Sequence, residues 1–138
     1  MIQAYSENIT VPFGSAIPFN NVSKIKGCDQ QLRAPATFEL DRCGVYNLTC
    51  HGNIDATGEV TVQVYQDGIA IPEAQATMTL TAGDIENFSF DTLITVDRNN
   101  TKCCCSSPTL IQIRVFDTPL TDGEATFDLI SCTITRLC

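Results

Sequence analysis

Apolar and polar residues alternate along most of the chain from Pro35 onward, with a period of two. Successive side chains of a strand point to opposite faces of a sheet, so this period predicts half-buried β-strands. The clearest case is GVYNLTCHGNI, in which Tyr46, Leu48 and Cys50 alternate with mostly polar neighbours. The expected strands are Thr37–Leu40, Gly44–Ile54, Glu59–Tyr65, Ile69–Leu80, Glu86–Val96, Leu110–Phe116 and Ala125–Leu137.

Turn-forming residues separate these segments. Asp67-Gly68 lies between two of them, and Asp-Gly between alternating segments is the strongest short signal for a β-hairpin. An irregularity is expected near Asp91-Thr92, where the alternation is interrupted. No segment has a helical period over about 11 residues or more. About seven or eight strands with regularly spaced turns predict an all-β fold, an antiparallel two-sheet sandwich or barrel.

Residues 1–27 lack a strong period and contain Pro12, Pro18, Gly14 and Gly27. We therefore expect an extended N-terminal arm (1–27), with a strand around Asn8–Phe13, ahead of a β-sandwich domain (28–138). A segment this apolar is expected to lie against its own domain or against a neighbour. The arm residues expected to dock on a neighbour are Ile9, Val11, Phe13, Ile17 and Phe19.

Composition restricts the possible partners. A chain of 138 residues with 43% hydrophobic residues is expected to form one domain with its own core. Its formal net charge of −8 argues against binding to nucleic acid or to an anionic membrane, which needs a basic surface. The N-terminus has neither a basic start nor a continuous apolar stretch, so no secretory signal is expected. No apolar run reaches membrane-spanning length.

Eight cysteines without a secretory signal are an unusual combination. Disulfides persist in oxidising surroundings, yet the chain is expected to be made in a cytosol. A protein released by lysis, as virion proteins are, reconciles the two. The residues expected to form disulfides or cross-links are Cys28, Cys43, Cys103, Cys104, Cys105 and Cys138.

Cysteine spacing favours disulfides over a metal site. The tract Cys103–Cys105 has CxC spacing, and no CxxC-like pair is present to build a structural zinc site. Cys50 and Cys132 lie in apolar strands and are expected to be buried thiols. A bridge from the tract to Cys28 or Cys43 would close a loop of about 60–75 residues and stabilise the fold by about 4 kcal/mol. An interchain link or a metal at a threefold axis remains an alternative.

Catalytic candidates are few. His51 is the only histidine, lies in an expected strand and has no catalytic motif around it. Two acidic groups, Asp55 with Glu59 and the turn around Asp122, fit turn formation better than calcium binding. We therefore expect no enzymatic activity and no cofactor.

A sequence motif leads into the long strand that begins at Gly44. The pattern F-x-L-x-x-x-G-x-Y-x-L comprises Phe38, Leu40, Gly44, Tyr46 and Leu48, and a valine-rich strand and an Asp-Gly hairpin follow it. With the apolar C-terminal strand, this order resembles the jelly-roll heads of the tumour-necrosis-factor and complement-globular-head superfamily over roughly Pro35–Cys138.

The same order is similar to small bacteriophage virion proteins and to trimeric spore-surface heads. The likeness to the phage proteins rests on the N-terminal arm, on the strand start Cys43-Gly44-Val45-Tyr46 and on the cysteine tract before Ser-Ser-Pro. The resemblance implies a TNF-like jelly roll that forms a symmetric homotrimer for adhesion, decoration or recognition.

These observations together favour a non-enzymatic structural virion protein of a bacteriophage, which decorates or stabilises the capsid as a trimer. Its expected partners are other copies of itself and the major capsid protein or another virion protein, with the arm Met1–Lys26 docked onto the shell. It would be made in the host cytoplasm and become extracellular after lysis. The alternative is a receptor-binding or adhesion head of a phage tail or a spore-surface fibre.

Overall fold

The computed structural model describes residues 1–27, 30–33, 36–81, 83–96, 108–118 and 122–137. Strands dominate these residues, which contain no helix. The strands are β1 (Ile2–Pro12), β2 (Asn21–Ile25), β3 (Gln30–Arg33), β4 (Thr37–Leu40), β5 (Gly44–Asp55), β6 (Gly58–Gln66), β7 (Ile69–Leu80), β8 (Ile85–Val96), β9 (Thr109–Asp117) and β10 (Glu124–Arg136).

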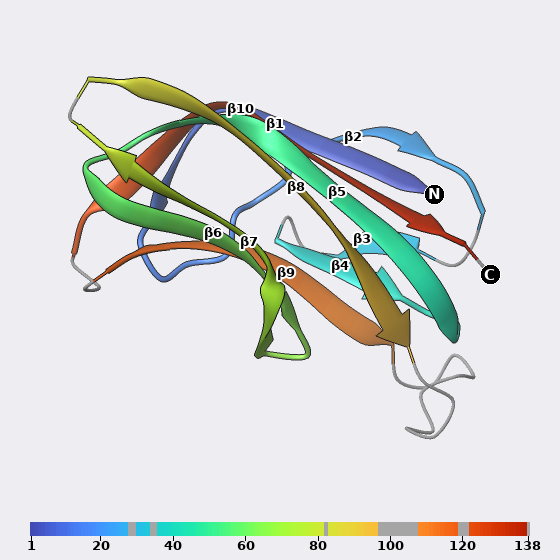
Figure 1. Ribbon diagram of the computed structural model, residues 1–138. Helices are drawn as coiled ribbons and strands as arrows, with labels where there is room; N and C mark the ends of the chain where they lie inside the picture. Colours follow the sequence, from blue (N-terminus) through green and yellow to red (C-terminus); the bar gives the residue numbers. More distant parts are fainter. Residues whose placement is uncertain (28–29, 34–35, 82, 97–107, 119–121, 138) are drawn as a thin grey trace.

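The strands form two five-stranded antiparallel sheets that face each other (Figure 1). Sheet A has the strand order β2-β1-β10-β5-β8, and sheet B has the order β3-β4-β9-β6-β7. Neighbours in each sheet are mostly distant in sequence, as a jelly roll requires. The core between the sheets includes the fully buried rings of Tyr46, Phe19, Phe38 and Phe127. The expected all-β, two-sheet jelly-roll sandwich is confirmed.

The alternation in the sequence located most strands closely. The bounds of β4 and β7 are those expected, and β5, β6, β8, β9 and β10 differ by one or two residues at their ends. Asp67 and Gly68 both have positive φ, 51° and 84°, which is the backbone of a type I′ hairpin turn. The expected irregularity at Asp91-Thr92 is wrong, because β8 pairs with β5 in one unbroken register from Val96 to Ile85. Leu93 points outward instead.

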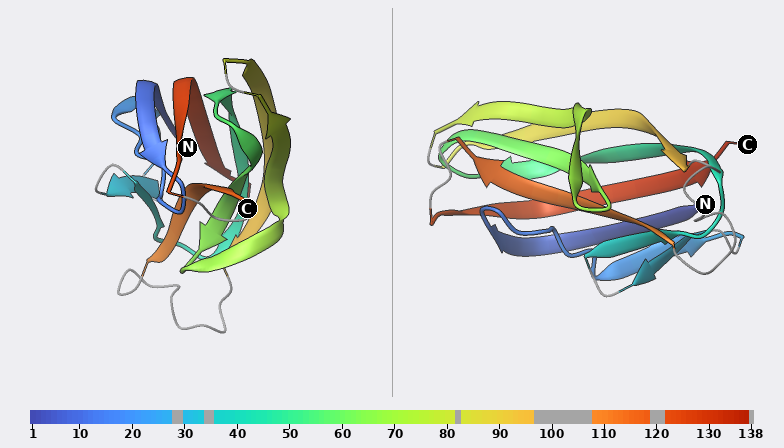
Figure 2. Two further views of the ribbon diagram at one scale, coloured as in Figure 1. Left: turned by 90° about the vertical axis from the view of Figure 1, so that its left-hand side faces the viewer. Right: turned by 90° about the horizontal axis from the view of Figure 1, so that it is seen from below.

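The N-terminal segment is part of the sandwich, which corrects the expectation of a separate arm at 1–27. Strand β1 lies between β2 and β10 within sheet A (Figure 2), and it pairs with β10 from Ile2 to Pro12. Of the residues expected to dock on a neighbour, Val11, Ile17 and Phe19 are buried in the core, and Ile9 and Phe13 pack against it. Their burial leaves them unavailable to a capsid lattice.

The connection between β1 and β2 joins the two sheets. It leaves sheet A, runs along β9 of sheet B and returns to sheet A (Figure 1). The N–H groups of Gly14 and Ile17 donate to the carbonyls of Val115 and Ile113, at 2.8 and 2.7 Å. The ring of Phe19 packs against Phe38, with centroids 5.3 Å apart. Strand β4 pairs only with residues 109–111 of β9, and the connection between β1 and β2 pairs with the following residues on the same edge.

A reversal of side-chain direction within β1 explains why the sequence pattern did not predict this strand over its full length. Ile2 and Ala4 point inward, and beyond Asn8 the inward positions are Ile9 and Val11. Asn8 has φ of 51°, in the left-handed region that asparagine tolerates better than most residues. The inward positions therefore change from even to odd at Asn8, so no single period of two describes the strand.

Strand β10 makes the same change beside β1. Ile130 and Cys132 point inward, as do Phe127 and Ala125, whereas Leu129 and Asp128 are both exposed. The register between β10 and β5 shifts between Thr126 and Leu129, which is the signature of a β-bulge.

Gly52 on β5 allows this bulge to pack. A Cβ at this position would lie 2.4 Å from the carbonyl oxygen of Leu129 and 3.0 Å from the Cα of Ile130. These are backbone atoms of the neighbouring strand, so a side chain at position 52 would push β5 and β10 apart.

Deletion of Met1–Val22 is predicted to unfold the protein. The deletion removes a central strand and the buried side chains of Ile2, Val11, Ile17 and Phe19, about 6–12 kcal/mol of apolar burial. This is comparable with the total stability of a typical domain, about 5–15 kcal/mol. Thermal melting followed by circular dichroism should show no cooperative transition. A truncated protein that melts cooperatively like the full chain would contradict the placement of β1.

Substitution of Gly52 by alanine is predicted to destabilise the fold by about 1–3 kcal/mol, because the added methyl group collides with backbone. Urea unfolding of the variant measures this loss. Ser89→Ala is the matched control, since Ser89 is exposed on β8 and pairs with His51 next to Gly52. Equal unfolding midpoints for Gly52→Ala and the wild type would show that the two strands are not so close.

Candidate functional site

The outer face of sheet A is uncharged over most of its area. Serine, threonine, asparagine and glutamine predominate at its outward positions on β1, β10, β5 and β8, and none of these positions is lysine or arginine. The charged side chains there are carboxylates, at Glu7, Asp55, Asp91, Glu124 and Asp128. Depletion of charge is characteristic of the centre of protein–protein interfaces.

Exposed aliphatic side chains concentrate on the same sheet. Leu93 on β8 is 59% exposed, and Ile25 on β2 is 55% exposed. In the described part of the chain, most large exposed hydrophobic residues lie on sheet A or at its ends, and the others lie on or beside sheet B. The sheet A set is Val22, Ile25, Ile85, Leu93, Leu129 and Leu137; the others are Ile69 and Leu110.

The two edge strands of sheet A differ in charge. Lys24 and Lys26 belong to the β2 edge, whereas the opposite edge strand, β8, carries Glu86 and Asp91. Between Arg42 and Arg98 the chain has no lysine or arginine, so β5 to β8 carry only negative formal charge at neutral pH. One edge of the sheet is therefore basic and the other acidic.

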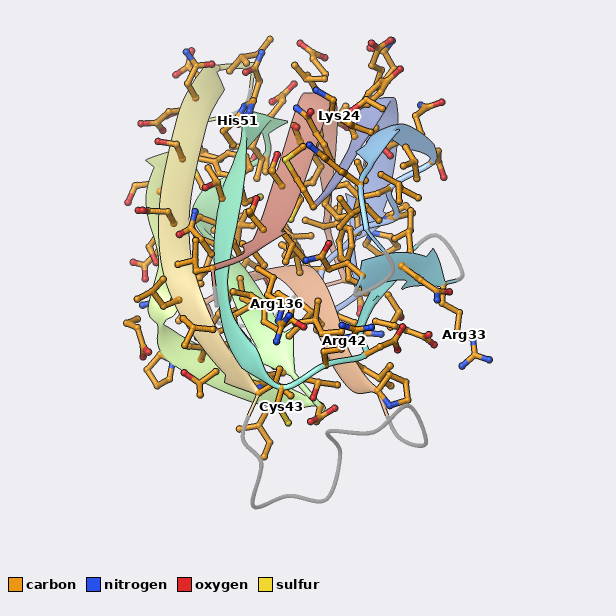
Figure 3. The ribbon with its side chains drawn as sticks, turned by 90° about the vertical axis from the view of Figure 1, so that its right-hand side faces the viewer. Lys24, Arg33, Arg42, Cys43, His51 and Arg136 are labelled. Carbon is orange, nitrogen blue, oxygen red and sulfur yellow. The ribbon has the colours of Figure 1, made fainter. Side chains whose placement is uncertain are left out.

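His51 lies on the outer face of sheet A, toward one end of the molecule (Figure 3). It is exposed on β5, between Ser131 of β10 and Ser89 of β8, and Tyr5 of β1 continues the row. Within the described residues no hydrogen bond or ion pair joins His51 to a serine, cysteine or carboxylate. The histidine is a surface residue of the strand, and no nucleophile–base pair forms around it.

Cys43 lies at the start of β5, at the other end of the molecule from His51 (Figure 3). Its carbonyl accepts a hydrogen bond of 2.8 Å from Nη2 of Arg136, and the next residue, Gly44, pairs with Val96 at the end of β8. Cys43 is disulfide-bonded, and its partner lies outside the described residues. Cys28, Cys103, Cys104, Cys105 and Cys138 also lie outside them, so the connectivity remains a prediction.

Cys50 and Cys132 are buried free thiols, as the sequence analysis expects. They are direct cross-strand neighbours on β5 and β10 and point into the core. Burial raises the pKa of both thiols well above the ordinary value, and the nearby Cys50 raises the pKa of Cys132 further. Both remain neutral thiols at physiological pH, so neither is an activated nucleophile.

Acidic side chains do not gather into a metal site in the described part of the chain. Asp55 and Glu59 flank the turn between β5 and β6, and Asp117, Asp122 and Glu124 flank the connection between β9 and β10. No group of three or more histidine, cysteine, aspartate or glutamate residues is placed to hold a cation, among the residues described. No membrane-spanning helix occurs among them either.

The outer face of sheet A was not among the sites expected from the sequence. The expected docking residues were apolar residues of the N-terminal segment, which the fold buries or packs against the core. Two signals in the sequence indicated the surface. One is Leu93, an apolar residue at a position that the alternation assigns to the outside, and the other is the run of serine, threonine and asparagine at the outward positions of β5 and β8.

Solved structures with the same arrangement of strands cover nearly the whole chain. The globular domain of zebrafish complement 1qA protein matches with a TM-score of 0.66 and 12% identity, over 99% of this chain and 98% of that chain. PRD1 vertex protein P5 matches with a TM-score of 0.64 and 11% identity, over 99% and 96%. Murine APRIL matches with a TM-score of 0.67 and 7% identity, over 99% and 98%.

No protein-family model and no curated protein sequence matches the chain. At these identities the solved structures establish the fold and not the activity. The chain has the TNF-like jelly-roll fold, which it shares with complement and cytokine heads and with a phage vertex protein.

Proposed function

We propose that the protein is a non-enzymatic structural head of a bacteriophage virion, which assembles as a homotrimer through sheet A and decorates or stabilises the capsid. The observation that carries the self-association is the outer surface of sheet A, where mostly uncharged polar side chains surround the exposed aliphatic side chains of Leu93 and Leu129 and no lysine or arginine occurs on β1, β10, β5 and β8. The structural similarity to the PRD1 vertex protein, over almost the full length of both chains, supports the proposal that this protein is part of a virion.

The charges at the two edges of sheet A favour a head-to-tail contact between copies. The basic β2 edge, with Lys24 and Lys26, complements the acidic β8 edge, with Glu86 and Asp91. Each edge also carries an exposed aliphatic residue, Ile25 on β2 and Leu93 on β8. Contacts between two different surfaces of one protein close into a ring when the rotation between copies allows it. A ring of three would bring together the mostly uncharged polar faces of the three A sheets.

Attachment to the capsid needs a surface other than the N-terminal segment. The side chains first expected to dock, Val11, Ile17 and Phe19 among them, are part of the core. The outer face of sheet B and the loops at the ends of the sandwich stay available to a capsid protein in a trimer built through sheet A.

Charge reversal at either edge is predicted to break the assembly, and reversal at both is predicted to restore it. Lys24→Glu with Lys26→Glu places like charges opposite Glu86 and Asp91 of the next copy, and Glu86→Lys with Asp91→Lys does the reverse. Multi-angle light scattering at low salt should show monomers for each double variant and oligomers for the quadruple variant. Salt screens such contacts, so these differences should shrink at about 1 M salt.

Glu59→Lys with Glu73→Lys is the control for Glu86→Lys with Asp91→Lys, since it changes the net charge by the same amount and sign but on exposed positions of sheet B. It should assemble like the wild type. If the quadruple variant stays monomeric, or if the control dissociates as readily, the proposed edge contact is wrong.

The number of copies in purified virions distinguishes capsid decoration from the alternative, a receptor-binding head of a tail. Quantitative mass spectrometry of particles, with the major capsid protein as the internal standard, is predicted to find the protein at hundreds of copies, in a multiple of three. A few copies that separate with isolated tails would favour the receptor-binding head. Particles that lack the protein entirely would refute both.

A further inference from the structure

A small hollow lies on the outer face of sheet B, on the opposite side of the molecule from the proposed self-association surface. It is lined by Tyr65 of β6, Arg114 and Phe116 of β9, and Gly14 of the connection between β1 and β2. Its volume is about 180 Å³. Sites for drug-sized ligands are about 300–1,000 Å³, so this hollow has room for a single small ring.

Arg114 is held in one orientation at this hollow. Its Nε and Nη2 donate to Oε1 of Gln112, at 3.3 and 2.9 Å. Its guanidinium carbon lies 4.5 Å from the centre of the Tyr65 ring. The Nε2 group of Gln112 in turn donates to the hydroxyl of Thr37 on β4, at 3.1 Å. A cation fixed by its neighbours loses little freedom when it binds a ligand.

The positive charge of Arg114 is not neutralised within the described residues. The ion pair among them joins Arg33 to Glu39, and no carboxylate there lies within 4 Å of Arg114. This is notable in a chain with 16 acidic and 8 basic residues. The hydrogen bonds to Gln112 use Nε and one hydrogen of Nη2, so Nη1 and the other hydrogen of Nη2 remain as donors.

We propose that this hollow binds a carboxylate-bearing monosaccharide, such as a uronic acid residue of a cell-surface polysaccharide. The free edge of Arg114 matches a carboxylate, which guanidinium groups bind through two parallel hydrogen bonds. Phe116 and Tyr65 supply apolar ring surface beside it, against which the C–H groups of a sugar ring can pack. Gly14 has no side chain, so it does not fill the hollow on its side.

Ligand binding at the hollow requires neither the trimer nor the capsid. The hollow lies on the face that assembly through sheet A would leave exposed. Binding by the monomer would support this site even if the proposed assembly failed.

Nuclear magnetic resonance titration of the full chain with glucuronate and galacturonate tests the proposal. Saturable shifts are expected at Gly14, Tyr65, Arg114 and Phe116, and glucose, galactose and acetate should bind at least about tenfold more weakly. Arg114→Gln should weaken uronate binding by about tenfold or more. The control Arg33→Gln, which removes an arginine already paired with Glu39, should bind like the wild type.

Three outcomes would overturn the proposal: no shifts at the hollow, equal binding of glucose and glucuronate, or equal binding by Arg114→Gln and the wild type. Equal binding of acetate would also overturn it, because the sugar ring would then contribute nothing. If Arg114→Gln does not fold, Phe116→Ser provides a second test, since it keeps the cation and removes apolar surface. Undiminished uronate binding by Phe116→Ser would count against the site.

Discussion

The antiparallel pairing of β1 with β10 is the contact on which the rest of the structure depends. It brings the two ends of the chain together in the middle of sheet A, where β1 separates β10 from the edge strand β2. Both strands change the direction of their side chains at the same level, near Asn8 and Asp128, so each keeps apolar residues in the core along its full length. Gly52 lets the third strand, β5, pack against that bulge.

The connection that follows β1 depends on the same pairing. Once β1 is fixed in sheet A, residues 13–20 can run across to β9 of sheet B and close that side of the sandwich. The buried hydroxyl of Ser6 holds the return to sheet A, since it donates to the carbonyl of Pro18 and accepts from the N–H of Asn20, at 2.7 and 2.8 Å. The N-terminal segment therefore contributes to folding, and surfaces elsewhere are left for function.

The two outer faces of the sandwich offer different chemistry. The face of sheet A is wide, has mostly uncharged polar side chains and is bordered by edges of opposite sign, which suits association with further copies of the same chain. The face of sheet B holds the oriented cation Arg114 beside two aromatic rings, which suits a small anionic ligand. An assembly through the first face would present the second outward, so self-association and recognition can coexist in one head.

Periodicity in the sequence was enough to predict the fold class and most of the strands. The alternation was clear enough to locate seven strands, including β10 with its bulge, and the Asp67-Gly68 turn has the backbone that its residues favour. Strand β1 was not predictable in this way, because Asn8 reverses the alternation halfway along it. Strands β2 and β3 are short, and the exposed residues of β2 give no pattern of burial.

The candidate site was harder to predict than the fold. Burial of Val11 and Phe19 depends on β1 entering sheet A, which a local pattern cannot show, so their apolar character suggested a docking arm. The hollow at Arg114 combines residues 14, 65, 114 and 116, which only the tertiary fold brings together. The free thiols were predictable, because Cys50 and Cys132 occupy inward positions of apolar strands.

The mass of the wild-type protein in solution tests the central claim, that this head assembles through sheet A, most directly. Sedimentation equilibrium at low salt, under non-reducing conditions, gives the mass of the purified protein, which is compared with the 15.0 kDa of a single chain. The account predicts a single species of three times that mass, which persists after reduction because the contact is non-covalent. A monomer at every concentration, or a trimer that separates into monomers when its disulfides are reduced, would contradict it.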